Sequence, residues 1–108
     1  MRKRKALAFA LIAGIFPVIG VAATHTNKEV AVFHSPDSRP CTFFTLTGVA
    51  EADPVVAGNP WFSIPQTHIG YKEIISVLLA ARTVGKTVTV GTAGTMACGH
   101  AAVQSVVY

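Results

Sequence analysis

The sequence predicts a small, mainly β domain with a single helix, and three observations lead to this prediction. Several short segments rich in β-branched and aromatic residues alternate between apolar and polar positions, as half-buried strands do. One stretch, residues 70–85, instead repeats its apolar residues with helical spacing. Clusters of Pro, Gly, Asp and Ser separate these segments and mark turns.

The beginning of the chain has the pattern of a secretory signal peptide. Residues 2–5 are all basic, and residues 6–23 form an apolar run that ends in small residues. We therefore expect a signal peptide over residues 1–23, a domain over residues 24–108, and a secreted or periplasmic protein. Cleavage is expected after Ala23, with the preceding bond as the alternative. The Gly and Pro content and the shortness of the run argue against a stable membrane anchor.

Removing this segment changes the electrostatic interpretation of the chain. Four of the nine Lys and Arg residues lie in residues 2–5, which leaves five basic residues against five acidic ones. The remaining domain is formally neutral and has no basic stripe that could neutralise phosphates. The composition therefore predicts no nucleic-acid partner.

Five segments of the domain are predicted as strands: Val30–Phe33, Cys41–Gly48, Trp61–Ile64, Thr87–Val90 and His100–Tyr108. In the second strand Phe44 and Leu46 share one face, so its early part needs a bulge or burial on both faces. In the third, Phe62 and Ile64 share a face. We expect residues 24–29 to be a loose polar terminus and residues 91–95 a hairpin loop.

The predicted helix has clear start and stop signals. Its apolar stripe consists of Tyr71, Ile74, Ile75, Leu78 and Leu79, and Gly85 follows as a left-handed stop. Residues 77–81 are apolar without a break, so the middle of the helix is apolar on more than one side. Either small Ala residues face solvent there, or this side of the helix meets a second subunit.

The order of these elements is three strands, one helix and two strands. That order predicts a five-stranded OB-type barrel with one helix between strands 3 and 4. The alternative is a small α+β sandwich in which the helix covers one face of an antiparallel sheet. Periodicity does not separate the two architectures.

The two cysteines, Cys41 and Cys98, predict a disulfide because an even number of cysteines in an exported chain is typical of one. In the chain-entropy treatment such a bridge is worth roughly 4 kcal/mol, a large contribution for so small a domain. The alternative is a metal site made by Cys98 and His100 with Cys41 and either His34 or His68. Its spacing matches no standard zinc pattern, so we expect no metal and no other cofactor.

No pattern in the chain predicts catalysis. Ser, His and Asp residues occur without a nucleophile-elbow motif, and a disulfide would remove the thiol that a Cys–His pair requires. The four histidines, His25, His34, His68 and His100, are interpreted as loop or strand-face residues. We therefore expect no enzyme. Trp61 is the candidate ligand-binding residue, as a platform for a sugar ring, with capping of the barrel end as the alternative.

Four short motifs resemble a known family. They are W-F-x-I-P, G-Y-x-x-I-x-S-x-L-L-x-A, G-K-x-V-x-V and C-G-x-A-x-V, at Trp61–Pro65, Gly70–Ala80, Gly85–Val90 and Cys98–Val103. In this respect the chain is similar to the B subunits of AB5 toxins, of the subtilase and pertussis-like kind. The resemblance implies an OB fold, a homopentameric ring with helices lining a pore, host-surface glycans as ligands, and a catalytic A subunit as partner in virulence.

The resemblance and the apolar helix together give expectations for individual helix residues. Lys72, Glu73 and Ser76 would lie near the pore, and the small Ala80 and Ala81 would permit close approach between subunits. The expected function is therefore a glycan-binding protein like a toxin B subunit, or an orphan relative of one. The alternative is a periplasmic or secreted structural or protein-interaction domain without a toxin partner.

Overall fold

The structure is a computed structural model that describes residues 22–36 and 38–108. It is mainly β with one α-helix, as predicted. The elements in order are β1 (Thr24–Lys28), β2 (Val30–His34), β3 (Cys41–Leu46), the short 3₁₀ helix η1 (Pro54–Val56), β4 (Phe62–Pro65), α2 (Tyr71–Val84), β5 (Val88–Ala97) and β6 (His100–Val107). The predicted signal peptide lies outside the described residues except for its last two, Ala22 and Ala23.

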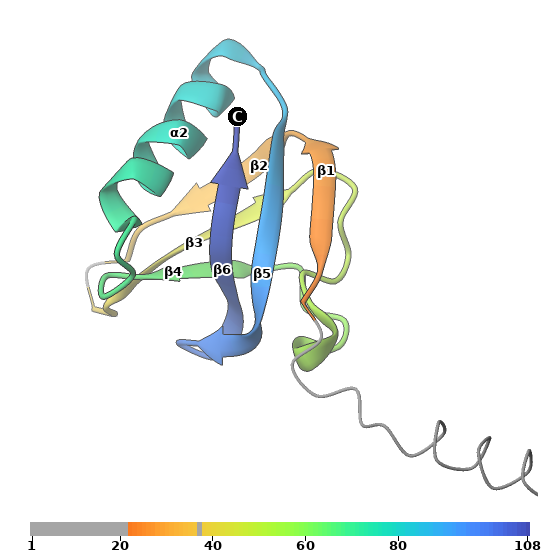
Figure 1. Cartoon of the computed structure of the whole chain (residues 1–108), viewed down its shortest axis with the longest axis vertical. Coiled ribbons are helices and arrows are strands. Elements are labelled where there is room, and N and C mark those ends of the chain that lie inside the picture. The colour runs from red at the N-terminus through yellow and green to blue at the C-terminus, as the bar shows by residue number, and fades with distance from the viewer. Residues whose placement is uncertain (1–21, 37) are drawn as a thin grey trace, which may run out of the picture.

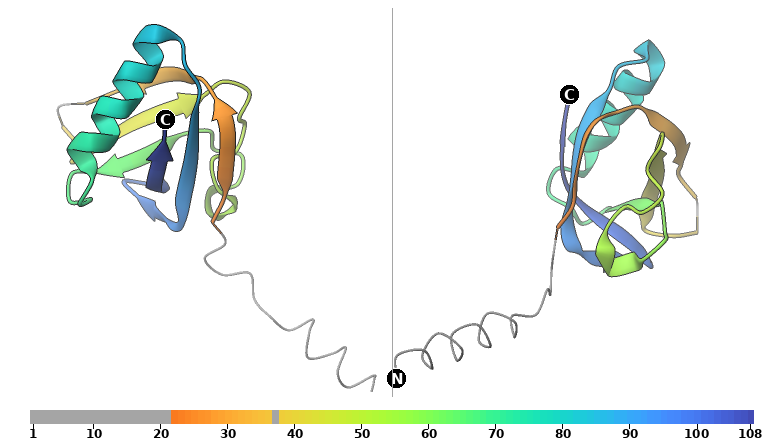
Figure 2. Two further views of the ribbon diagram at one scale, coloured as in Figure 1. Left: turned by 45° about the horizontal axis from the view of Figure 1, so that its top comes forward. Right: turned by 90° about the vertical axis from the view of Figure 1, so that its right-hand side faces the viewer.

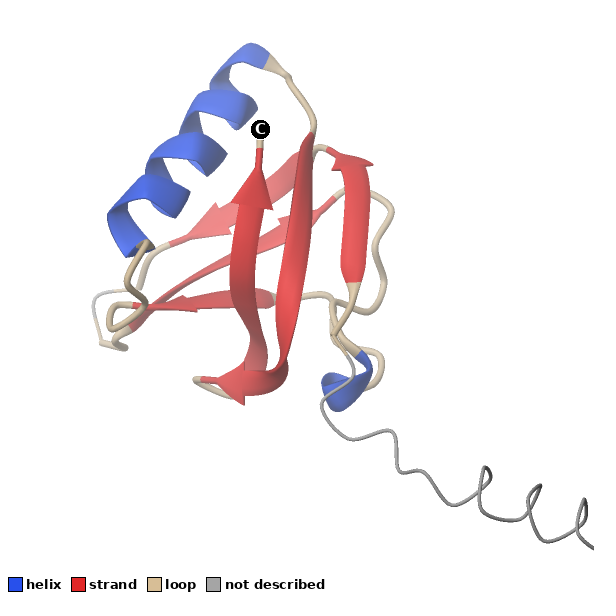
Figure 3. Cartoon of the chain, in the orientation of Figure 1, coloured by secondary structure: helices blue, strands red, loops and turns tan. Residues whose placement is uncertain are grey.

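The described strands form one open, mixed sheet of six strands in the order β1-β5-β6-β4-β3-β2. All neighbours are antiparallel except β4 and β6, which are parallel. In Figures 1 and 2, β1, β5 and β6 run across the direction of β2, β3 and β4. Figure 3 shows α2 beside one end of this arrangement and η1 beside the other. The predicted closed barrel of five strands is therefore not confirmed, and the helix follows the fourth strand rather than the third.

The additional strand is β1, where a loose terminus was expected. Its residues, Thr24–Lys28, pair antiparallel with β5, and none of their side chains is fully buried. An edge strand of this kind is held by backbone hydrogen bonds and carries no apolar face. Hydropathy alone therefore gave no signal for it.

The second difference is at residues 91–95, which belong to β5 and do not form a loop. Gly91 lies close to β6 there, because a Cβ atom would be 3.2 Å from Oγ of the exposed Ser105. The hairpin instead turns at Cys98 and Gly99, whose φ angles of 51° and 81° are both positive, and Ala97 pairs with His100 across it. A two-residue turn that matches the right-handed twist of its flanking strands requires positive φ at both central residues.

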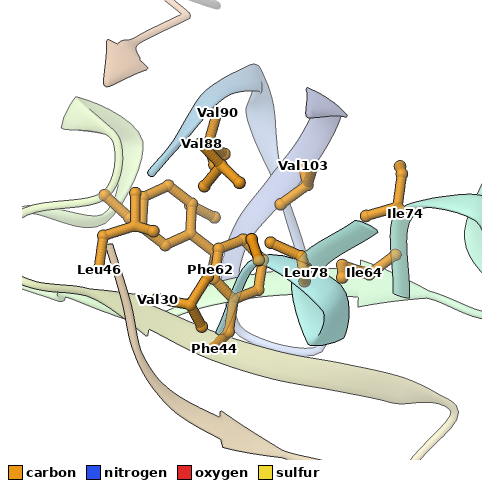
Figure 4. Close-up of a cluster of buried hydrophobic side chains, with 13 residues drawn as sticks. Val30, Phe44, Leu46, Phe62, Ile64, Ile74, Leu78, Val88, Val90 and Val103 are labelled. Atoms are coloured by element: carbon orange, nitrogen blue, oxygen red, sulfur yellow. The ribbon is translucent and has the colours of Figure 1, made fainter. Parts of the chain in front are cut away.

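The core lies between the two sets of strands and the helix (Figure 4). At its centre the rings of Phe44 and Phe62 stack with centroids 4.9 Å apart and planes 10° apart. Leu46 and Ile64 are buried in the same cluster, so the predicted core faces of β3 and β4 are confirmed. The first four residues of β3 are all buried. This strand is therefore covered on both faces, one of the two arrangements expected for it.

Helix α2 ends as predicted. Gly85 adopts the left-handed conformation with φ 73°, and Lys86 N donates to Ala81 O at 2.8 Å. The Nη1 atom of Arg82 donates to Val30 O at 3.1 Å, which fastens this end of the helix to β2. The predicted apolar stripe is confirmed at Tyr71, Ile74, Ile75 and Leu78, which are buried or pack against the core. It is rotated slightly, because Ala81 is buried and Leu79 is exposed.

Two predictions about the outer side of α2 are affected by this rotation. Leu79 is 44% exposed and Ala80 is exposed, so the apolar character on a second side is real. Ala81 is 0% exposed and belongs to the core of its own chain. The expectation that Ala81 contacts another subunit is therefore wrong, whereas Lys72, Glu73, Ser76 and Ala80 all face outward.

The predicted disulfide is present. Cys41, the first residue of β3, is joined to Cys98 in the β5–β6 turn, with the Cα atoms 6.6 Å apart. The bond ties the β5–β6 hairpin to β3, which lies on the other side of β4 in the sheet. Its position explains why the outer face of β3 is covered near its start.

We predict that replacing both cysteines with alanine lowers the free energy of unfolding by about 2–5 kcal/mol, because the bridge restricts the unfolded chain. Urea denaturation of the oxidised protein and of the double variant measures the difference. A change below about 0.5 kcal/mol, the usual range for harmless surface substitutions, would contradict a structural role.

We predict opposite outcomes at two adjacent helix positions. Ala81→Glu should cost roughly 3–5 kcal/mol because it leaves an uncompensated charge in the core, whereas Ala80→Glu should cost little. Thermal unfolding of the two variants under reducing-agent-free conditions compares them. Equal stability of both variants would show that Ala81 does not pack in the core.

Candidate ligand-binding site

A hollow of about 270 Å³ lies on the outer face of β3, opposite the core. The residues that line it come from the end of β2, the following loop, β3, the residue before β4, and the start of β6. They are His34, Pro36, Ser38, Arg39, Phe43, Trp61 and His100. The group contains four aromatic or imidazole rings, those of His34, Phe43, Trp61 and His100. They lie apart in the sequence, and the sheet pairing brings them together.

Phe43 forms the floor of this hollow. Its side chain alternates with that of Phe44 along β3, so it points away from the core, yet it is only 3% exposed. The ring of His100 meets it edge-on with centroids 5.2 Å apart, and the ring of His34 lies at 6.3 Å. The guanidinium carbon of Arg39 lies 4.8 Å from the centroid, within cation–π distance.

Trp61 stands at the edge of the hollow, one residue before β4. Its backbone N–H donates to Oδ1 of Asn59 at 2.9 Å, and its side chain is partly exposed. The indole is therefore outside the core cluster and available to a ligand. Trp61 is also the only tryptophan in the chain. The sequence-based candidate thus lies in the hollow, although pattern alone favoured a capping role for it.

Asn59 couples Trp61 to His100 and fixes the state of that histidine. Because Oδ1 of Asn59 accepts from Trp61 N, its Nδ2 is the atom that faces Nδ1 of His100, at 2.9 Å. An amide nitrogen is a donor only, so Nδ1 must accept and the proton of the neutral ring lies on Nε2. Protonation of His100 would place two donors against each other.

Two effects keep His100 neutral. Burial, and in addition the nearby positive charge of Arg39, lowers the pKa of His100 below the usual histidine value. Nη2 of Arg39 donates to the carbonyl oxygen of Cys98, which holds the guanidinium beside the disulfide and over Phe43. Arg39 is thus a fixed cation at the site, and no carboxylate belongs to its described lining.

Sequence reasoning missed the grouping of Arg39, Phe43 and His100. The available signal was Phe43 itself, an apolar residue on the face of β3 that does not contribute to the core.

The other two histidines, His25 and His68, have local structural roles. Nε2–H of His25 donates to Ala52 O at 2.8 Å, and Nδ1 of His68 accepts from Gly70 N at 2.9 Å, just before α2.

Two further hollows were compared with this one. The larger, about 550 Å³, lies at the C-terminal end of α2, where Leu79, Arg82 and Lys86 contribute to it. The other, about 290 Å³, lies beside Tyr108, whose ring is covered by Nζ of Lys86 at 4.9 Å. Neither gathers several rings and convergent hydrogen-bonding groups, the usual features of a small-molecule site. The hollow at Trp61 is therefore the candidate site despite its smaller size.

The structure also bears on the alternatives to ligand binding. Both cysteines are consumed by the disulfide, so the metal site that required their thiolates is excluded. Within residues 22–36 and 38–108, no three His, Cys, Asp or Glu side chains are grouped so as to hold a metal ion. In the same part of the chain, no helix has the length and apolar character needed to cross a bilayer.

Comparison of the chain with protein-family models, with curated proteins and with solved structures finds no match.

We predict that the His100–Asn59 link weakens in acid. Because the pKa of folded His100 is lowered, the unfolded chain takes up its proton first, so this contribution to stability is complete above about pH 6.5 and is lost as the pH falls toward the folded pKa. NMR titration of the imidazole protons, with His100→Gln to assign the resonance, measures the midpoint. A midpoint for His100 at or above the unfolded value would contradict the arrangement.

Proposed function

We propose that the protein is an exported, disulfide-linked binding domain that holds a sugar ring of a glycan against Trp61. The observation that carries this proposal is the position of the chain's only tryptophan, beside a hollow with an aromatic floor and convergent polar groups. Aromatic rings cover the apolar C–H face of a sugar, and surrounding donors and acceptors bind its hydroxyl groups.

The charges of the hollow restrict the class of ligand. Arg39 contributes a permanent positive charge, and His100 is kept neutral by burial and by Arg39. A cationic ligand would be repelled, so we propose a neutral or anionic sugar. The volume of about 270 Å³ suits one ring of a larger glycan, with the rest of the chain in solvent.

Export is the second part of the proposal. Its support is the basic and apolar pattern of residues 1–23 together with the Cys41–Cys98 disulfide, because disulfides persist in oxidising compartments. The disulfide lies directly beneath the site, where Arg39 bonds to the carbonyl of Cys98. An oxidising environment would therefore support the binding surface as well as the fold.

We also propose that the sheet is a variant of the OB-type arrangement. Glu29 alone separates β1 from β2, and these strands pair with β5 and β3 at the two ends of the sheet order. Glu29 O accepts from Thr47 N at 2.9 Å, which continues the pairing through the junction. If β1 and β2 are two halves of one bent strand, five strands remain, with the helix after the third and the third parallel to the fifth. This topology supports the proposed relation to toxin-like B subunits, or to a stand-alone domain of that type.

A second proposal concerns assembly, and the exposed apolar side chains of α2 favour it. Leu79 is 44% exposed and Val84 is 64% exposed on a domain too small to cover them itself. We predict that the mature protein forms a ring of identical chains, five if the toxin resemblance holds, and that Leu79→Glu dissociates it without unfolding the domain. Light scattering after size-exclusion chromatography decides, and a monomer at micromolar concentration would contradict it.

We predict that a glycan array and titration of intrinsic fluorescence both detect sugar binding, because every change in tryptophan emission must come from Trp61. Trp61→Ala should weaken binding by about 1–3 kcal/mol, roughly 5-fold to 160-fold in Kd, with little effect on stability. The control is Tyr108→Ala, since Tyr108 is an exposed aromatic residue outside the hollow. Unchanged affinity in Trp61→Ala, or equal loss in Tyr108→Ala, would refute this site.

A further inference from the structure

Asp53 is a buried acidic residue with no part in the proposed ligand site. It precedes η1 and is 0% exposed. Its Oδ1 atom accepts from Val55 N at 2.8 Å, and its Oδ2 atom accepts from Oγ1 of Thr92 on β5. Both of these donors are neutral groups, a backbone amide and a threonine hydroxyl. A buried carboxylate normally needs a positive charge nearby, because burying an unbalanced charge is costly.

The group that lies beyond Thr92 is the backbone nitrogen of Ala23. This N–H donates to Oγ1 of Thr92 at 2.8 Å, and Thr92 N donates to Ala23 O at 2.9 Å. Thr92 is itself 1% exposed. One enclosed hydroxyl group therefore accepts from Ala23 N and donates to the carboxylate of Asp53, and it bridges the two groups.

Ala23 is consequently part of the folded domain. It extends the pairing of β1 with β5 by one residue beyond Thr24, the residue opposite Gly91. Cleavage after Ala23 would remove this residue, so Thr92 N would lose its acceptor and Oγ1 of Thr92 would lose a donor, although this hydroxyl would keep its bond to Asp53. Cleavage one bond earlier would keep it, and it would place the small residues Gly20 and Ala22 at the third and first positions before the cut.

We infer that processing occurs between Ala22 and Ala23 and that the new α-amino group of Ala23 is the positive charge that balances Asp53. Hydrolysis adds one water across this peptide bond, giving a carboxylate on Ala22 and, after protonation, an ammonium group on Ala23. The ammonium keeps the hydrogen bond to Thr92, and only that one hydroxyl group separates its positive charge from the carboxylate of Asp53. The inference rests on the export part of the proposed function.

Docking of this ammonium has a consequence for stability. Before cleavage the same nitrogen is a neutral amide, so Asp53 stays unbalanced and the β1 edge is held less firmly. After cleavage the ion pair raises the pKa of the α-amino group. The added stability is complete below the unfolded value of about 8 and is lost as the pH rises through the folded pKa.

The first measurement is the N-terminal residue of protein purified after export, determined by mass spectrometry. The inference predicts Ala23. A chain that begins at Thr24 would overturn the inference and leave the export proposal intact. A chain that still carries Arg2–Lys5 would overturn both.

The second measurement is a thermodynamic cycle on protein that begins at Ala23. Nα-acetylation should lower the folding equilibrium constant at pH 6.5 by about tenfold, the equivalent of one pKa unit, because it removes the charge but keeps the N–H. The loss should be much smaller in the Asp53→Asn background. Glu51→Gln is the matched control, since Glu51 is an exposed acid of the same loop. Equal losses in the native and Asp53→Asn backgrounds would overturn the inference.

NMR titration of the Ala23 α-amino group in the unsubstituted protein gives a result even if Asp53→Asn does not fold. The inference predicts a pKa about one unit or more above the range of 7.7–8.0 found in peptides. A value inside that range would overturn it.

Discussion

The disulfide between Cys41 and Cys98 is the constraint on which both the core and the candidate site depend. It fixes the start of β3 against the β5–β6 turn, on the face of the sheet opposite the Phe44–Phe62 stack. With it, Phe43 is enclosed between the turn and the loop before β3, and a small domain acquires a second set of buried side chains.

The same bond explains how the ligand site is held. The carbonyl of Cys98 accepts from Arg39, and His100 follows two residues later at the beginning of β6. Asn59 then connects His100 to Trp61 by two hydrogen bonds. A continuous chain of interactions therefore runs from the disulfide to the backbone of Trp61, so the His100 ring and the Trp61 main chain are positioned by groups that are themselves held. Such preorganisation lowers the entropy lost when a ligand binds.

Much of the fold was predictable because local signals were strong. The apolar spacing and Gly85 predicted α2, and alternation predicted the core faces that contain Phe44 and Phe62. Sequence patterns gave the wrong structure where strand pairing, and not hydropathy, determines it. Strand β1 is polar and lies at an edge, and residues 91–95 belong to a strand whose pairing with β6 shifts register at Gly91/Thr92 and again before Met96. Helical spacing from Ile74 and Leu78 does place Ala81 on the buried face of α2, but the unbroken apolar run of residues 77–81 obscured this signal. The candidate site was predictable only at Trp61. Arg39, Phe43 and His100 come together through strand register, which the sequence does not display.

The most direct measurement of the central claim is a two-dimensional NMR titration of the ¹⁵N-labelled oxidised protein with a glycan selected from an array. If the disulfide-supported hollow is the binding site, the indole signal of Trp61 and the amide signals of Phe43, Arg39 and His100 move most. Reduction of the Cys41–Cys98 bond should then abolish these changes. Shifts centred on Arg82 and Lys86 at the end of α2, or the same shifts after reduction, would contradict the account.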